Sequence, residues 1–163
     1  GTMLDTIRLK SLISKKIGIS SNDINLYVLG EHGNSQFVYY NNANIAMSSL
    51  KNYLTKEEKD EFSSITKKMG GMIVNAKGYT SHGVSCCLLE LTKVILNDEK
   101  KIYPVSNYQS DYDLYFSTPV VIGKDGIIKQ IPVKLNEEEE KQLVMVTKVL
   151  KEAVDEVLPP ELY

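Results

Sequence analysis

Three side chains near the start of the chain form a set that could bind a small carboxylic acid and move a proton. Asp5 and Arg8 lie three residues apart in a segment of helical periodicity, so they share one helix face. His32 follows in a glycine-flanked loop. An arginine holds a carboxylate through two parallel hydrogen bonds, a histidine exchanges a proton near neutral pH, and an aspartate accepts from the other ring nitrogen. The set favours acid–base chemistry on a bound organic anion.

Each of these residues also has a purely structural interpretation. Arg8 is the single arginine of the chain, which makes it a candidate for two-point anion recognition. A surface arginine paired with Asp5 fits the same spacing. His32 by itself can be an exposed loop histidine. The combination of the three residue types, rather than any one of them, indicates a site.

The hydrophobic pattern predicts the elements that must position this set. Apolar residues at helical spacing from Leu4 predict a helix that ends at Gly18. A buried strand is expected over residues 24–29, and it places His32 in the loop that follows. A second strand is expected over residues 36–45, with its pairing disturbed at the two asparagines in its middle.

The rest of the chain predicts long helices and an antiparallel strand group. Thr55 and Glu58 form a capping box, so a helix should begin there and run to Lys77, with a weak point at Gly70-Gly71. The other expected elements are a helix from 80 or 81 to 96, strands at 101–107, 114–122 and 127–133, a turn at Asp125-Gly126, and a helix from 137 to 157 that Asn136 caps and Pro159-Pro160 ends. This order indicates an α+β fold in one domain.

Composition and charge limit the classes of partner. The chain has 163 residues, of which 42% are hydrophobic and 25% charged, the balance of one globular domain. Its formal net charge of -2 argues against a nucleic-acid partner. No stretch is long and apolar enough to cross a membrane and no secretory signal is evident, so we expect a cytoplasmic protein. Cys86 and Cys87 are adjacent, which excludes a disulfide framework and a zinc site.

The residues of the candidate site also carry a resemblance to a known family. The segments Gly1–Arg8 and Gly30–Ser35 resemble the two signatures of the L-lactate dehydrogenases, the L-2-hydroxyacid dehydrogenase family. The likeness extends along the chain, since Lys77–Ser81 resembles the substrate-pocket segment of that family and Ile122–Ile127 resembles its late hairpin. The resemblance implies a lactate/malate dehydrogenase-like C-terminal domain, with antiparallel strands packed against long helices.

The resemblance also implies a reaction and assigns roles in it. The reaction would be the NAD-dependent interconversion of a 2-oxo acid and an L-2-hydroxy acid, with pyruvate and L-lactate as the leading pair. Arg8 would anchor the substrate carboxylate, His32 would donate and accept the proton, and Asp5 would orient His32, while the nicotinamide carries the hydride. Thr80 matches a residue of the substrate pocket and Val84 one that contacts the nicotinamide, although a helix cap and a core position explain these two equally simply.

The sequence contains no Gly-x-Gly-x-x-Gly motif after a strand, so it lacks the signature of a dinucleotide-binding half. In the family a Rossmann domain with that motif precedes the catalytic domain. We therefore expect residues 1–163 to be the C-terminal catalytic domain alone, to bind NAD only in part, and to be inactive in isolation. The resemblance further implies a homo-oligomer, a tetramer in the full-length form.

Several finer assignments remain open. Gly33–Phe37 and Tyr115–Pro119 look closer to L-2-hydroxyisocaproate dehydrogenases, which implies a larger, branched substrate. A noncatalytic carboxylate-binding or oligomerisation module would preserve the same fold. Malate dehydrogenases match less well, because their usual loop lacks a glutamate before the catalytic histidine. Many bacterial members bind fructose 1,6-bisphosphate through two basic positions, which here are Lys10 and Asn25, so we expect a weak or absent response. His82 is expected to fill the pocket wall.

Overall fold

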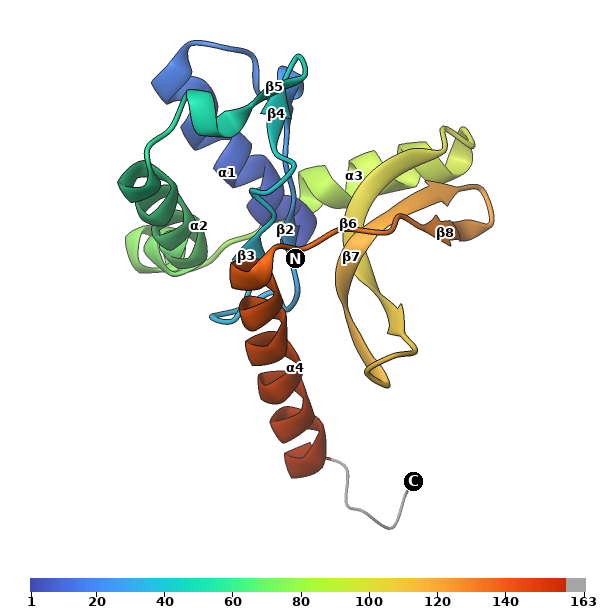
Figure 1. Cartoon of the computed structure of the whole chain (residues 1–163). Helices are drawn as coiled ribbons and strands as arrows, with labels where there is room; N and C mark the ends of the chain where they lie inside the picture. Colours follow the sequence, from blue (N-terminus) through green and yellow to red (C-terminus); the bar gives the residue numbers. More distant parts are fainter. Residues whose placement is uncertain (158–163) are drawn as a thin grey trace.

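The structure is a computed structural model, and it describes residues 1–157. The α-helices within this range are α1 (Thr2–Ile17), α2 (Lys56–Lys77), α3 (His82–Leu96) and α4 (Glu137–Val157). The strands are β1 (Ile24–Asn25), β2 (Val28–Leu29), β3 (Phe37–Val38), β4 (Asn44–Ile45), β5 (Ser48–Ser49), β6 (Lys101–Gln109), β7 (Leu114–Gly123) and β8 (Gly126–Gln130). Two short 3-10 helices, η1 (Ser21–Asp23) and η2 (Leu50–Asn52), complete the order (Figure 1). The α+β fold class is confirmed.

Helix α1 forms because its apolar residues repeat at helical spacing and Gly18 stops it. Leu9 and Ile13 are fully buried against the short strands that follow. Gly18 adopts a left-handed conformation at φ 71°, which a glycine reaches without strain, and its N–H bonds to the carbonyl of Ser14. The helix axis thereby fixes the position of Asp5 and Arg8 in its first two turns.

The two strands expected at residues 24–29 and 36–45 are each broken in two. β1 pairs with β4, whereas β2 pairs with β3, both antiparallel. The two expected strands therefore pair with each other in two pieces of different register, with Ile24 opposite Ile45 and Val28 opposite Val38, and periodicity does not contain this shift. A turn closed by Ala43 N–H on the carbonyl of Tyr40 separates β3 from β4, close to the disturbance expected at the asparagines.

Helix α2 begins at the predicted capping box. Thr55 Oγ1 accepts from Glu58 N–H at 3.2 Å, and Glu58 Oε2 accepts from Thr55 N–H at 2.9 Å. The helix continues unbroken through Gly70-Gly71 to Lys77, so the expected weak point does not interrupt it. Two glycines lower helix propensity by about 1 kcal/mol each relative to alanine, which a 22-residue helix with a good cap can absorb.

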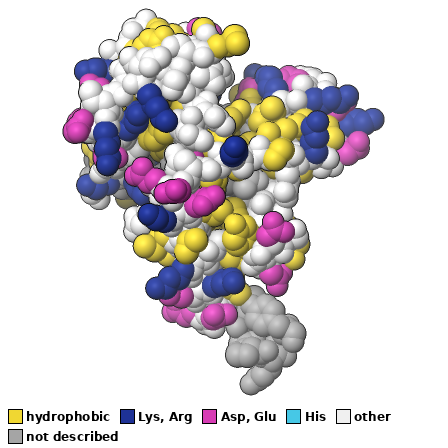
Figure 2. Space-filling model, viewed as in Figure 1, with side chains coloured by type: hydrophobic (Ala, Val, Ile, Leu, Met, Phe, Trp, Pro, Cys, Tyr) yellow, Lys and Arg dark blue, Asp and Glu magenta, His cyan; other side chains and the backbone are white. Residues whose placement is uncertain are grey.

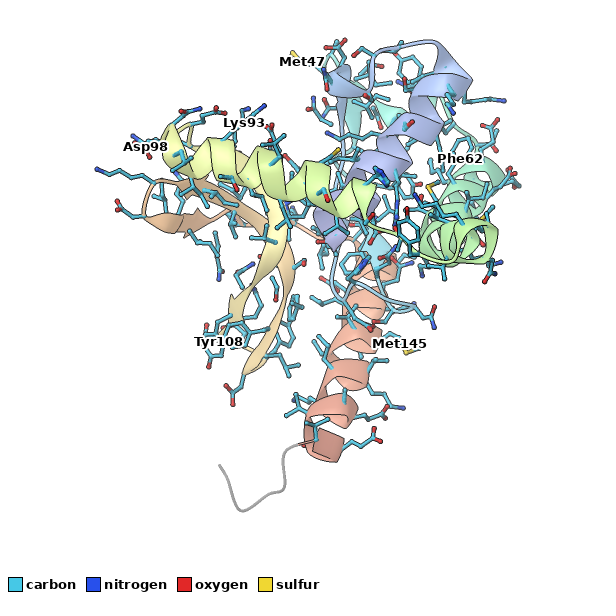
Figure 3. All side chains as sticks on the ribbon, turned by 180° about the vertical axis from the view of Figure 1, so that it is seen from behind. Met47, Phe62, Lys93, Asp98, Tyr108 and Met145 are labelled. Atoms are coloured by element: carbon cyan, nitrogen blue, oxygen red, sulfur yellow. The ribbon has the colours of Figure 1, made fainter. Side chains whose placement is uncertain are left out.

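The strands β6, β7 and β8 form an antiparallel sheet with α3 across one face (Figure 1). Val94 of α3 packs between Val120 and Ile122 of β7. β8 ends at Gln130, three residues before the expected position, because Pro132 cannot donate to a ladder. Seen from behind, α3 crosses the sheet near Lys93, while Tyr108 lies toward the far end of the β6–β7 hairpin (Figure 3).

Helix α4 extends away from the rest of the molecule and is anchored at its start (Figure 1). Asn136 Oδ1 accepts from the N–H groups of Glu138 and Glu139, as the sequence predicted for the cap. Val146 is fully buried in a cluster with Leu29 and Phe37, whereas other apolar side chains remain visible beside the helix (Figure 2). The expected stop at Pro159-Pro160 lies outside the described residues. Within residues 1–157, no helix is long and apolar enough to span a membrane.

Candidate active site

The structure brings Asp5, Arg8 and His32 into direct contact. Nδ1 of His32 donates to Oδ2 of Asp5 at 2.6 Å, because an ionised carboxylate can only accept. The other oxygen of Asp5, Oδ1, accepts from Nη1 of Arg8 at 3.2 Å. The carboxylate of Asp5 thus accepts from both an imidazole and a guanidinium. Helical spacing predicted only the contact with the guanidinium of Arg8.

Two backbone features hold the His32 loop against α1. Thr6 Oγ1, one residue after Asp5, accepts from the N–H of Val28 at 2.9 Å and ties the helix to β2. Gly30 then turns the chain at φ 86° and forms two hydrogen bonds of 2.9 Å with Ser117 of β7. A side chain at Gly30 would also meet Cγ2 of Val146 at 2.8 Å. The loop that carries His32 therefore begins at a residue, Gly30, whose position is fixed and where only glycine fits.

All five side chains proposed for the site line one cavity of about 230 Å³. Asp5, Arg8 and His32 form one part of its wall, and Thr80 and Val84, from the α2–α3 connection and α3, form another. The N-cap position of α3 is Ser81 rather than Thr80, so the alternative interpretation of Thr80 as a cap is not realised. Val84 is 46% exposed, which also sets aside its interpretation as a core residue.

Burial differs strongly among the three contacting residues. The side chains of Asp5 and Arg8 are only 3% and 10% exposed, whereas that of His32 is 56% exposed. The buried carboxylate of Asp5 is hydrogen-bonded to both Arg8 and His32, and it fixes the ring orientation of the histidine. The second ring nitrogen of His32 is then left to exchange a proton with a ligand in the cavity.

Six further residues line the cavity. Gly33, Asn34 and Gln36 belong to the segment that follows His32, whereas Leu4, Lys67 and Gly70 were not assigned to the site from the sequence. Lys67 Nζ donates to the carbonyl of Asn34 at 3.0 Å, two residues beyond His32, and burial lowers the pKa of Lys67. A Cβ at Gly70 would lie 3.8 Å from Nη1 of Arg8. Lys67 and Gly70 share a helix face by their spacing, but only the packing of α2 against α1 reveals that this face borders the site.

The expectation about a neighbouring histidine is wrong. His82 does not line the cavity: it is exposed, and its Nδ1 lies 3.2 Å from Nζ of Lys77. It occupies the first position of α3, where its side chain turns back toward the end of α2. Of the two adjacent cysteines, Cys86 is exposed and Cys87 is buried, and burial raises the pKa of the Cys87 thiol. The described residues contain no cluster of His, Cys, Asp and Glu that could hold a metal ion.

Fold and cavity together define an α+β domain with an acid–base pair beside a buried guanidinium. Residues 2–159 match the lactate/malate dehydrogenase, alpha/beta C-terminal domain family. The chain belongs to this family, as the two sequence signatures predicted.

Named relatives agree with this assignment. The L-lactate dehydrogenase of Streptococcus equinus is 31% identical over 172 aligned positions, which cover 99% of this chain and 52% of that enzyme. The solved malate dehydrogenase from Aeropyrum pernix matches with a TM-score of 0.91 and 34% identity, covering 100% of this chain and 56% of the other. A lactate dehydrogenase enzyme, MGS-M5, from a Medee basin deep-sea metagenome library gives a TM-score of 0.91 at 31% identity, covering 95% and 53%. The chain spans about half the length of these relatives.

Proposed function

We propose that this chain is the substrate-binding domain of an NAD-dependent L-2-hydroxyacid dehydrogenase, with pyruvate and L-lactate as the leading substrate pair. The contact of 2.6 Å between Asp5 and His32, in the same cavity as Arg8, carries the proposal. An oriented imidazole beside a buried guanidinium is the arrangement needed to protonate the carbonyl of a bound 2-oxo acid.

The three residues would act in sequence on the substrate. Arg8 binds the carboxylate and holds the 2-oxo carbon beside His32. A protonated His32 donates to the carbonyl oxygen in reduction, and the neutral ring takes the proton back in oxidation. Asp5 accepts a hydrogen bond from Nδ1 of His32 and keeps the proton-exchanging nitrogen turned to the cavity.

The residues present fit one end of the proposed cofactor. Val84 exposes an apolar side chain at the cavity, next to Thr80, and an apolar surface beside a polar cavity suits the flat face of a nicotinamide ring. Bound there, NAD would supply or accept the hydride. The remainder of the dinucleotide would be held by a separate nucleotide-binding domain.

The apolar face of α3 supports a larger assembly. Val84, Leu88 and Ile95 repeat at helical spacing and are 46%, 60% and 37% exposed. Such a stripe, starting at the cavity, is suited to be covered by another domain or subunit. We propose that residues 1–163 work with an NAD-binding domain in a cytoplasmic homo-oligomer, and that this chain alone has no turnover.

Lactate leads because relatives of this chain bear the name L-lactate dehydrogenase. A branched 2-hydroxy acid is the alternative, and it is favoured by the lack of a side chain at Gly70 in the wall of the cavity. 2-Oxoisocaproate has three more carbon atoms than pyruvate, and each methylene group changes discrimination in an apolar pocket by about 1 to 3 kcal/mol, so the two acids should differ measurably in kcat/KM. Kinetics on pyruvate and 2-oxoisocaproate would rank them.

The proposal is tested by fusing this chain to an NAD-binding half from a relative. We expect NADH-dependent reduction of pyruvate or 2-oxoisocaproate, its loss in His32→Asn, and weaker 2-oxo acid binding with lower turnover in Arg8→Lys. Lys93→Met, on the outer part of α3, is the matched control and should retain activity. Binding of 2-oxo acids without turnover in a properly folded fusion would instead identify a noncatalytic carboxylate-binding module.

A further inference from the structure

A second, larger cavity of about 600 Å³ borders the candidate active site. It lies between η2 and α2 on one side and the start of α4 on the other, with β3 also in its wall. Gln36 and Lys67 line both cavities. The volume falls in the range of small-molecule sites, and the shared residues connect it physically to the substrate cavity.

Four lysines give this larger cavity a positive character: Lys51, Lys56, Lys59 and Lys67. Within residues 1–157 none of the four ammonium groups forms an ion pair. Lys56 and Lys59 stand at the start of α2, where the helix dipole disfavours a positive charge. Figure 2 shows dark-blue side chains gathered over the η2–α2 side of this face. The cations are therefore placed where the fold itself does not neutralise them.

Three acidic residues also line the cavity, and both carboxylate oxygens of one of them already accept hydrogen bonds from the protein. Glu139 is 4% exposed, and its two carboxylate oxygens accept from the N–H groups of Asn41 at 2.8 Å and Asn136 at 3.1 Å. Asp60 and Glu138 are solvent-exposed, so water screens their repulsion of an anion. The balance of charge on the cavity wall stays positive.

A buried hydroxyl in the same wall has no partner. Thr66, directly before Lys67, is 1% exposed, and its Oγ1 makes no hydrogen bond in the part of the chain that the structure describes. An unpaired buried hydroxyl is unfavourable, and an acceptor oxygen brought close by a small side-chain adjustment would relieve it.

We propose that the larger cavity binds a small organic anion that carries at least two negative charges. Such an anion would contact the Lys56 and Lys67 ammonium groups and compete with the Asn34 carbonyl for Lys67. Because Lys67 lines both cavities, two anions would share one cation, and each would weaken the binding of the other by the same factor. This coupling rests on the proposed function, whereas the anion site does not.

The test is a titration of the 163-residue chain with citrate and with pyrophosphate, followed by amide chemical shifts in NMR, against sodium chloride at matched ionic strength. We expect saturable shifts around Thr66 for at least one probe, with Lys56→Met and Lys67→Met each weakening binding about tenfold. Lys68→Met, on α2 but outside the cavity, should leave binding unchanged. Tighter binding of citrate would indicate a carboxylate ligand, and tighter binding of pyrophosphate would indicate a phosphate ligand.

Two further variants locate the bound anion and test the coupling. Arg8→Gln should leave citrate or pyrophosphate binding intact, because Arg8 lines only the smaller cavity. Saturating anion should weaken pyruvate binding to the wild type and should have no effect in Lys67→Met. Shifts that sodium chloride reproduces, or equal losses in Lys67→Met and Lys68→Met, would overturn the anion site. Anion binding without any pyruvate binding would instead refute the proposed function and leave this site standing.

Discussion

At the scale of single residues, the site is built on one buried carboxylate. Asp5 compensates the charge of a guanidinium that is itself nearly buried, and it orients an exposed imidazole. Stability and proposed catalysis therefore depend on different members of the same cluster. Removing the charge of Asp5 would leave Arg8 buried without its ion-pair partner, whereas His32 can be changed with little effect on packing.

We expect Asp5→Asn to destabilise the chain by about 1–3 kcal/mol, because a hydrogen bond to a charged group is lost inside the protein. His32→Asn should change the free energy of unfolding by less than about 0.5 kcal/mol, since its side chain is mostly exposed. Urea unfolding of both variants measures the difference. Equal destabilisation would show that His32 contributes to packing in a way that its exposure does not indicate.

The residues of the site were predictable to different degrees. Spacing alone gave the Asp5–Arg8 pair, because residues three apart on a helix are neighbours. The contact between Asp5 and His32 is long-range, and the resemblance to a family, not periodicity, led to it. Neither residue spacing nor the family resemblance predicted Lys67 and Gly70, because their place in the cavity wall depends on how α2 packs against α1.

At the scale of elements, the ends of helices were the most predictable features. The capping box at Thr55 and the stop at Gly78 are local chemistry, so the sequence contains all the information they need. Strand bounds were less predictable at 24–29 and 36–45, since these two segments pair with each other in two pieces whose register differs, and periodicity does not contain that shift. Long strands with a local hairpin, such as β7 and β8, were found nearly at their true positions.

The start of α2 should be sensitive to acid. Glu58 pairs with Lys16 at 2.7 Å and also accepts from Thr55 N–H, and these bonds hold its pKa below the ordinary value of 4.5. A depressed pKa in the folded state means that this stabilisation is present above about pH 4.5 and is lost as the pH falls through the folded-state pKa. We expect Glu58→Gln to lower Tm near neutral pH, and the difference from wild type to shrink at about pH 3. Thermal melts by circular dichroism at both pH values measure this, and a constant difference would contradict it.

At the scale of the whole molecule, the apolar surface is distributed unevenly. The face of α3 next to the cavity carries Val84, Leu88 and Ile95, whereas Met47 stands alone on the β4–β5 turn, 96% exposed (Figure 3). Scattered exposed residues are normal, but an apolar stripe that begins at the candidate active-site cavity favours the proposed contact surface. The relatives are about twice as long as this chain, which leaves a domain of similar size as one candidate to cover the stripe.

Leu88→Lys separates a contact surface from a simple exposed leucine. Leu88 is 60% exposed, so the free energy of unfolding of the chain alone should change by less than about 0.5 kcal/mol. Association with an added NAD-binding half, or with a second copy, should fall about tenfold or more, because a charge must then be desolvated within the contact. Met47→Lys is the matched control, since it places the same charge on an isolated apolar position. Sedimentation of both variants measures the association. Equal association in Leu88→Lys and Met47→Lys would mean that the α3 stripe is not a contact surface and that the partner domain docks elsewhere.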